Sequence, residues 1–142
     1  MPYQSSDERV VCRKVQTKKD FRTWISIVNA VLHGWDMIDA DNYYTWVENE
    51  YVDIYLGEFD GVPVSTAATI RNGDVASLEF VSTIEGYRRN KIASVVCSEA
   101  LENLFSNGVE EVTLSACGES VHLYEKFGFK SYFNNIIMHY GI

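Results

Sequence analysis

The fold is decided by one continuous stretch from Val75 to Ala116, which reads VASLEFVSTIEGYRRNKIASVVCSEALENLFSNGVEEVTLSA. Its first part, Val75–Thr83, has the composition of a strand, and its middle part, Ile92–Phe105, has apolar residues at helical spacing. Asn107-Gly108 predicts the end of that helix, and Val109–Ala116 follows as a second strand. A strand, a helix and a strand in this order predict a right-handed crossover between two parallel strands.

The sequence before this stretch predicts further strands and two helices. Thr17 and Asp20 have the spacing of a capping box, and apolar residues from Phe21 to Leu32 then recur at helical spacing until His33-Gly34. A second helix is expected over Asp41–Glu50. Strands are expected over Val10–Val15, Val52–Phe59 and Val64–Ile70, with hairpin turns at Asp60-Gly61 and Asn72-Gly73.

The sequence after Ala116 predicts a short helix and two last strands. These elements are Ser120–Phe127, Phe129–Tyr132 and Ile136–Tyr140. The expected fold class is therefore α/β (α+β), with a mixed, mostly antiparallel sheet of about seven strands and helices on both faces.

Length and composition predict one domain over residues 1–142, in a soluble protein of the cytoplasm. Apolar residues make up 46% of the 142 residues, which is enough for a packed core. No apolar run approaches the roughly 20 residues of a membrane helix, and the N-terminal residues are too charged for a signal peptide. Cys12, Cys97 and Cys117 are widely spaced, which is typical of small buried residues and not of a disulfide framework or metal site.

The charge is strongly negative and unevenly distributed. The formal net charge is −8, and the segment from Asp36 to Asp60 has eight acidic residues and no Lys or Arg. Such a chain repels a nucleic-acid backbone and attracts cations, although a solvated acidic face explains the same composition. His33, His122 and His139 have no metal-ligand spacing, so no metal is expected.

Two segments carry residues suited to chemistry. Gly86-Tyr-Arg-Arg-Asn-Lys-Ile-Ala-Ser94 connects a strand to a helix, where backbone N–H groups and three cations favour an anion. Leu123-Tyr-Glu-Lys-Phe-Gly-Phe129 offers the Tyr124 hydroxyl as a proton donor. Taken singly, the first segment also fits a solvated polar loop, and Tyr124 fits an ordinary buried tyrosine.

Together and in this order, the two segments resemble the GNAT superfamily of acetyl-CoA-dependent N-acetyltransferases. The resemblance covers most of the chain and is strongest from Val75 to Phe129. The family's loop pattern is Gln/Arg-x-x-Gly-x-Gly/Ala, and here it reads Arg88-Arg89-Asn90-Lys91-Ile92-Ala93. Lys91 stands where the first Gly is expected, and Cys117 stands where many members have an Asn that touches the cofactor.

The resemblance implies an acyltransferase that moves the acetyl group of acetyl-CoA directly to a primary amine. It implies that the strand before the loop splays from its parallel neighbour at the centre of the sheet, and that pantetheine inserts there. By position, Tyr124 protonates the leaving sulfur, and Glu79 is a base or orients a water, on the same face as Val81. The expected cofactor-binding residues are Val81, Thr83, Arg88, Arg89, Asn90, Lys91, Ile92, Ala93, Ser94 and Cys117.

The acceptor is expected to contact the region from Trp24 to Tyr51, because the family usually binds its acceptor with the first two helices. Trp35, Tyr43, Tyr44 and Trp46, with the nearby carboxylates, suit a cationic amine or a basic peptide end, although aromatic residues at this spacing also build cores. An alternative is a catalytically weak sensor of CoA or acetyl-CoA, or an interaction module, with the same fold. A homodimer is a further expectation, since many proteins of this fold pair through their sheets.

Overall fold

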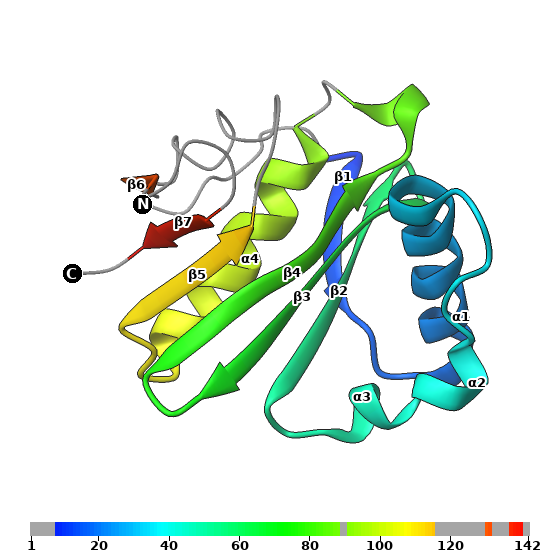
Figure 1. Ribbon diagram of the computed structural model, residues 1–142. Coiled ribbons are helices and arrows are strands. Elements are labelled where there is room, and N and C mark those ends of the chain that lie inside the picture. The colour runs from blue at the N-terminus through cyan, green and yellow to red at the C-terminus, as the bar shows by residue number, and fades with distance from the viewer. Residues whose placement is uncertain (1–7, 89–90, 116–129, 132–136, 141–142) are drawn as a thin grey trace.

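The computed structural model describes residues 8–88, 91–115, 130–131 and 137–140, and its centre is one seven-stranded sheet with the order β1-β2-β3-β4-β5-β7-β6 (Figure 1). Its strands are β1 (Val10–Lys14), β2 (Val52–Phe59), β3 (Val62–Asn72), β4 (Val75–Thr83), β5 (Glu111–Ser115), β6 (Lys130–Ser131) and β7 (Ile137–Tyr140). Only the β4–β5 pair is parallel among the strand pairs of these residues. The predicted mixed, mostly antiparallel sheet is therefore confirmed.

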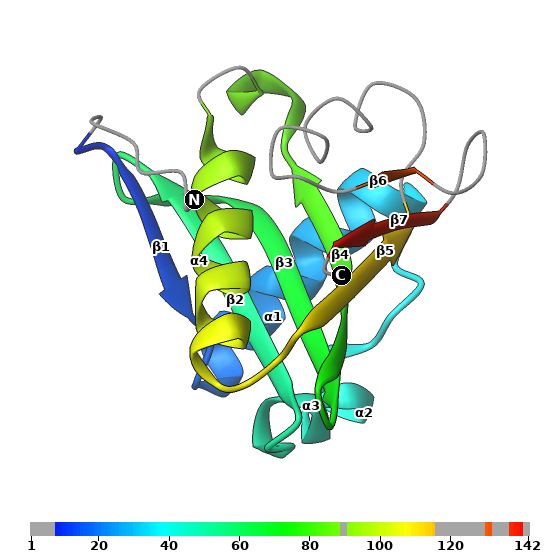
Figure 2. The ribbon, with the colours of Figure 1, turned by 90° about the vertical axis from the view of Figure 1, so that its left-hand side faces the viewer.

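Helices cover both faces of the sheet, as the sequence predicts (Figure 2). The helix α4 (Ile92–Ser106) packs on one face over β1, β2, β3 and β4. The other face is covered by α1 (Lys18–Val28) and the π-helix η1 (Asn29–His33), with the short helices α2 (Ala40–Tyr43) and α3 (Thr45–Glu48). Each face has its own buried apolar cluster, which includes Leu104 on the α4 side and Trp24 on the α1 side.

The first helical region differs from the prediction in two ways. Thr17 caps α1 by accepting a hydrogen bond from Asp20 N at 3.1 Å, as expected. The helix then continues as a π-helix, and Leu32, predicted to face inward, is 44% exposed. The helix predicted over Asp41–Glu50 is two short helices, because the backbone departs from regular helix at Tyr44.

Positive backbone φ angles mark both predicted hairpin turns. The turn between β2 and β3 has φ of 53° at Asp60 and 83° at Gly61, and the turn between β3 and β4 has 70° at Gly73. Asn, Asp and Gly tolerate this region better than other residues, so both turn predictions are confirmed.

The first turn of α4 packs closely on β2 because Gly57 has no side chain. A Cβ on Gly57 would lie 2.6 Å from Val96 Cγ2 and 2.9 Å from Ile92 Cγ2. Only glycine leaves this space, since well-packed cores tolerate little added volume. Gly57 therefore fixes how closely the start of α4 approaches the sheet.

No helix in the described part of the chain is both long and apolar enough to cross a membrane.

Of the cysteines, Cys97 is buried and Cys12 is half-buried, while Cys117 lies outside the described residues. Burial raises the pKa of the Cys97 thiol to about 12, and burial beside Glu99 also raises the pKa of Cys12 well above its usual range. These two thiols are thus protonated at neutral pH and poorly suited to nucleophilic chemistry.

Candidate functional site

The strand β4 has two halves with different partners. In the first half, Val75–Leu78, every residue pairs with β3 on one side and with β5 on the other. The parallel pairing ends at Leu78 and Leu114, and no described residue of β5 pairs with Glu79–Thr83. We call Val75–Leu78 the closed half of β4 and Glu79–Thr83 the open half.

A β-bulge lies inside the open half, directly after Glu79. Ala68 pairs with Glu79 and Thr66 pairs with Ser82, so β4 has one more residue than β3 between these pairs. Phe80 occupies the bulge with φ of 55°, a conformation uncommon for a residue that is not glycine. The bulge changes the alternation of side chains along β4.

The prediction that Glu79 and Val81 share a face is wrong for this reason. Glu79 pairs with Ala68, which belongs to the apolar cluster under α1, and Phe80 packs against the same cluster. Val81 instead packs against the cluster under α4. Regular pairing thus places Glu79 on the α1 face, and the bulge keeps Phe80 on that face and turns Val81 to the opposite one.

Four hydroxyl side chains hold the backbone of the open half. Ser65 Oγ donates to Ser82 O at 2.8 Å and lies 3.0 Å from Thr83 Oγ1, and Thr66 Oγ1 donates to Phe80 O at 2.7 Å and contacts Ser82 Oγ. Each hydroxyl has one proton, so Thr83 must donate to Ser65, and Ser82 must donate to Thr66. The sequence interpretation missed Ser65, Thr66 and Ser82, although a Ser-Thr pair inside an apolar strand is a signal for such a role.

These hydrogen bonds fix which backbone groups face away from β3. The carbonyls of Phe80 and Ser82 accept from β3 side chains, and the described peptide bonds are trans. In a planar trans peptide the next N–H is directed opposite to the carbonyl, so the N–H groups of Val81 and Thr83 face away from β3. Val81 and Thr83, both expected to bind the cofactor, therefore present these N–H groups on the side where β5 pairing has ended.

The segment predicted to bind an anion lies next to the open half, at the start of α4. The 3-10 helix η2 (Glu85–Tyr87) connects β4 to this region, and the first intrahelical bond of α4 runs from Val95 N to Lys91 O at 3.1 Å. The N–H groups of Ile92, Ala93 and Ser94 therefore have no partner within the helix. Together with the positive end of the helix dipole, they are suited to bind a phosphate oxygen.

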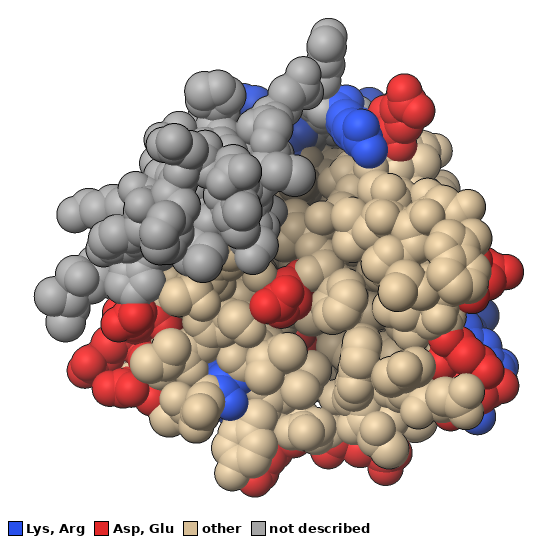
Figure 3. Space-filling view, viewed as in Figure 1, with Lys and Arg blue, Asp and Glu red and all other residues tan. Residues whose placement is uncertain are grey.

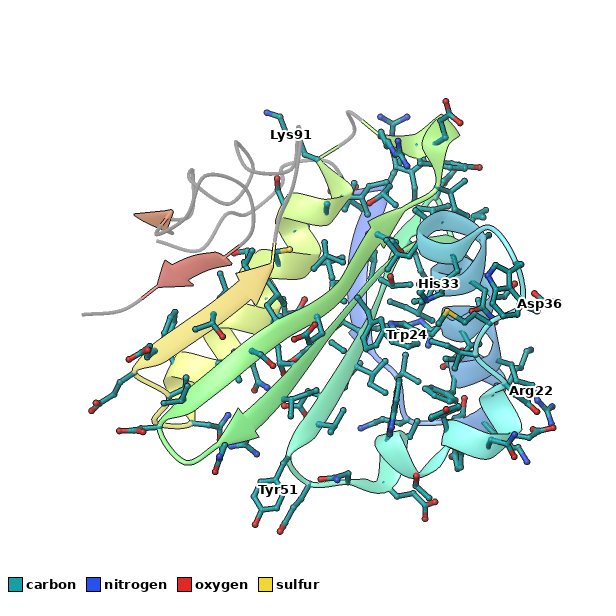
Figure 4. All side chains as sticks on the ribbon, in the orientation of Figure 1. Arg22, Trp24, His33, Asp36, Tyr51 and Lys91 are labelled. Carbon is teal, nitrogen blue, oxygen red and sulfur yellow. The ribbon has the colours of Figure 1, made fainter. Side chains whose placement is uncertain are left out.

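Two of the predicted cations lie at this site within the described residues. Arg88 Nε donates to Thr83 O at 3.2 Å, which joins the loop to the end of the open half. Lys91 is the N-cap of α4 and has φ of 62° and ψ of 19°, so the position at which the sequence pattern leads us to expect a glycine is left-handed in this structure. Lys91 is exposed and projects from the start of α4 (Figure 4).

The surface charge differs between the two ends of the molecule. Lys and Arg side chains lie at the end of the molecule where β4 leads into η2, next to an acidic side chain, and others lie among Asp and Glu at the right-hand edge, whereas Asp and Glu side chains predominate at the opposite end (Figure 3). In a protein with a net charge of −8, the end at η2 is the one most suited to an anionic ligand.

Four predicted site residues, Arg89, Asn90, Cys117 and Tyr124, lie outside the described residues.

On the α1 face, the predicted acceptor region divides into core and surface. The ring of Phe80 lies 5.4 Å from that of Trp24 and 5.6 Å from that of Trp46, measured between centroids. Trp24 is fully buried and is a core residue, whereas Trp35 is 64% exposed and Tyr43 is 42% exposed. The core interpretation is therefore confirmed for Trp24, whereas Trp35 and Tyr43 are exposed and their contact with an acceptor stays a prediction.

Comparison with known sequences assigns this arrangement to a family. A sequence model described as "Acetyltransferase (GNAT) family" matches residues 18–129, which is most of the chain. The chain belongs to the GNAT acetyltransferase family. The start of α4, the open half of β4 and the whole of α1 fall within the matched residues of this GNAT protein.

Solved structures have the same fold as this GNAT protein. The ribosomal-protein-S18-alanine N-acetyltransferase of Escherichia coli matches with a TM-score of 0.75 at 18% identity, covering 92% of both chains. The PaiA N-acetyltransferase of Thermoplasma acidophilum, solved in complex with coenzyme A, matches with a TM-score of 0.71 at 16% identity, covering 94% of this chain and 99% of that one. At these identities the likeness shows the fold.

A longer plant protein contains a related segment. "Increased DNA methylation 1" of Arabidopsis thaliana is 31% identical over a 117-residue alignment that covers 78% of this chain. The matched segment is 9% of that protein, so this GNAT domain spans only a small part of the relative's length.

Proposed function

We propose that this GNAT protein transfers the acetyl group of acetyl-CoA directly to a primary amine. The observation that carries the proposal is the open half of β4, with the N–H groups of Val81 and Thr83 directed away from β3 beside the start of α4. An extended pantetheine arm can pair with such an edge as an added strand. The diphosphate then falls at the anion site, where unpaired helix N–H groups and cations lie together.

In this proposal the residues of the open half bind the thioester end. The Val81 N–H donates to the thioester carbonyl, which gains negative charge as the amine attacks, and fixed N–H donors stabilise that charge. The Thr83 N–H binds pantetheine. Arg88, Arg89, Asn90, Lys91, Ile92, Ala93 and Ser94 hold the pyrophosphate, and Cys117 lies beside the cofactor.

Proton transfers complete the reaction. Acetyl-CoA supplies an activated acyl group with a thiolate leaving group, and Tyr124 donates the proton that the sulfur needs. An alkylammonium ion must lose a proton before it attacks, because its pKa lies far above neutrality. Glu79 is proposed to accept this proton, directly or through water, because its pairing with Ala68 places it on the α1 face where the acceptor region lies.

The proposed acceptor is a cationic amine, such as a polyamine, an amino sugar or a basic peptide end. Exposed Trp35 and Tyr43 offer ring faces, and the segment Asp36–Asp60 has acidic residues without Lys or Arg. Both features attract cations.

The proposal is tested by incubating the protein with acetyl-CoA and a panel of these amines, with detection of the added acetyl group by mass. Acetylation above the level without protein supports the enzyme. Tight CoA binding without transfer to any amine supports the alternative, a CoA sensor. Tyr124→Phe is expected to slow transfer while CoA affinity stays unchanged, and an unchanged rate would remove Tyr124 from the mechanism.

A further inference from the structure

Three buried side-chain atoms among the described residues have no hydrogen-bond partner: His33 Nε2, Thr69 Oγ1 and Arg71 Nε. Thr69 and Arg71 pair with Leu78 and Ala76, which both face α4, so these two lie on the α4 face of the closed half. His33 is in η1 and lies on the other face. Among the described residues, His33 Nε2 is therefore the one buried side-chain nitrogen without a hydrogen-bond partner on the α1 face, where the proposed acceptor region lies.

The π-helix is what turns His33 toward the sheet. Gly34 N donates to Asn29 O at 2.7 Å, and the Asn29 side chain holds the backbone of Ile38 through two hydrogen bonds of 2.8 and 3.0 Å. Each residue of a π-helix advances by less than the roughly 100° of an α-helix, which shifts the inward positions along the chain. Leu32 consequently faces solvent, and His33 takes an inward position.

His33 lies where η1 packs against β4. η1 packs against β4, and Figure 4 shows His33 projecting from η1 toward the sheet on the side of Trp24. The ring of Trp24 in turn contacts that of Phe80, the bulge residue of the open half. His33 thus belongs to the same face as Glu79 and Phe80.

A buried nitrogen without a partner is costly, and a ligand that supplies the partner removes this cost only in the bound state. A neutral imidazole has one nitrogen that accepts a hydrogen bond. We propose that His33 is an acceptor-binding residue, whose Nε2 accepts a hydrogen bond from the attacking amine and positions it beside the open half of β4. This inference rests on the proposed amine acetyltransferase function.

The first test reads the imidazole directly and needs no turnover. Spermidine, glucosamine and a lysine-containing peptide are each added to the CoA-bound protein, and the ¹⁵N resonances of its histidine side chains are followed by NMR. The inference predicts that at least one amine shifts the Nε2 resonance of His33. If none of the three shifts it at saturating concentration, His33 does not bind the acceptor.

The second test distinguishes a role of His33 in amine binding from a purely structural role. His33→Leu is expected to raise the KM for the best amine of the panel about tenfold with a smaller change in kcat, whereas His33→Gln, which keeps a polar atom near Nε2, recovers part of the loss. Thr69→Val is the matched control, since it removes an orphan polar atom from the α4 face and should leave KM unchanged. An unchanged KM in His33→Leu overturns the inference and assigns Nε2 a structural role only.

The failure of this inference is distinguishable from failure of the proposed function. If the wild-type protein acetylates no amine, the proposed function fails, and the NMR titration still decides whether His33 contacts an amine. If the wild-type protein acetylates an amine and His33→Leu has the same KM, only the role of His33 is lost.

Discussion

The closed and open halves of β4 belong to one strand but have different physical constraints. Val75–Leu78 is held by strand pairing on both sides, so its backbone groups are used by the sheet. Glu79–Thr83 pairs with β3 alone among the described strands. Two of its backbone carbonyls accept hydrogen bonds from β3 side-chain hydroxyl groups. A strand at the centre of a sheet can therefore direct backbone N–H donors away from its neighbour when side-chain hydrogen bonds fix the orientation of its peptide groups.

The largest effect is expected from filling the space at Gly57. Gly57 pairs with Ser65, which pairs with Thr83, so these residues form one rung across the open half under the first turn of α4. Gly57→Ala should destabilise the fold by about 1–3 kcal/mol and weaken CoA binding, because the added Cβ meets Val96 and Ile92. Denaturant unfolding and CoA titration measure the two effects.

The control for this change is Gly86→Ala. A Cβ at Gly86 would have no heavy atom within 4 Å, so stability should be unchanged. Equal stability of the Gly57→Ala and Gly86→Ala proteins would contradict the close approach of α4 to the open half.

A second prediction compares two threonines of β3. Thr66→Val removes the donor to Phe80 O beside the open half and should cost roughly 1–2 kcal/mol of stability and slow acetyl transfer. Thr69→Val, opposite the closed half, removes a hydroxyl that has no partner and should leave stability equal or slightly higher. Thermal unfolding of the two variants checks this, and equal losses would show that the hydroxyls do not hold the open half.

A third prediction concerns two arginines at opposite ends of β4. Arg88 contacts Thr83 O in the open half, and Arg71 pairs with Ala76 in the closed half. Arg88→Ala should weaken CoA binding about tenfold, or roughly 1.4 kcal/mol, and reduce its dependence on salt. Arg71→Ala should leave CoA affinity unchanged, so similar affinities in calorimetric titrations of both variants would refute the position of the anion site.

The smallest effect is expected at Lys91. The left-handed backbone conformation of Lys91 is about 1 kcal/mol less favourable for a residue with a Cβ than for glycine. Lys91→Gly should therefore raise the stability of the unliganded protein by about that amount. The cation is lost at the same time, so CoA affinity should fall slightly. A chemical denaturation midpoint below that of the wild type would show that the side chain of Lys91 contributes more than its backbone costs.

The sequence predicted the sheet because its strands and crossover depend on local patterns, and the expectation of an anion site rests on a local pattern as well. The crossover follows from the order of elements between Val75 and Ala116, and the anion site follows from cations at the start of a helix. The bulge at Phe80 was missed, because a phenylalanine in an apolar strand gives no sign of a positive φ. The error at Glu79 follows directly, since one added residue reverses the alternation of faces.

The π-helix was missed for a related reason. The spacing from Phe21 to Leu32 fits an α-helix, and the change to a π-helix depends on tertiary hydrogen bonds between Asn29 and Ile38. Local periodicity does not contain such contacts. Residues such as His33 are therefore placed correctly only when the packing of the whole face is known.

Backbone hydrogen exchange with and without CoA tests the central claim, the open half of β4, most directly. The account predicts rapid exchange for the amides of Val81 and Thr83 in the unliganded protein and strong protection when CoA is bound, while the amides of Ala76–Leu78 exchange slowly in both states. Val81 and Thr83 amides that are already as protected as those of the closed half, or that do not respond to saturating CoA, would contradict it.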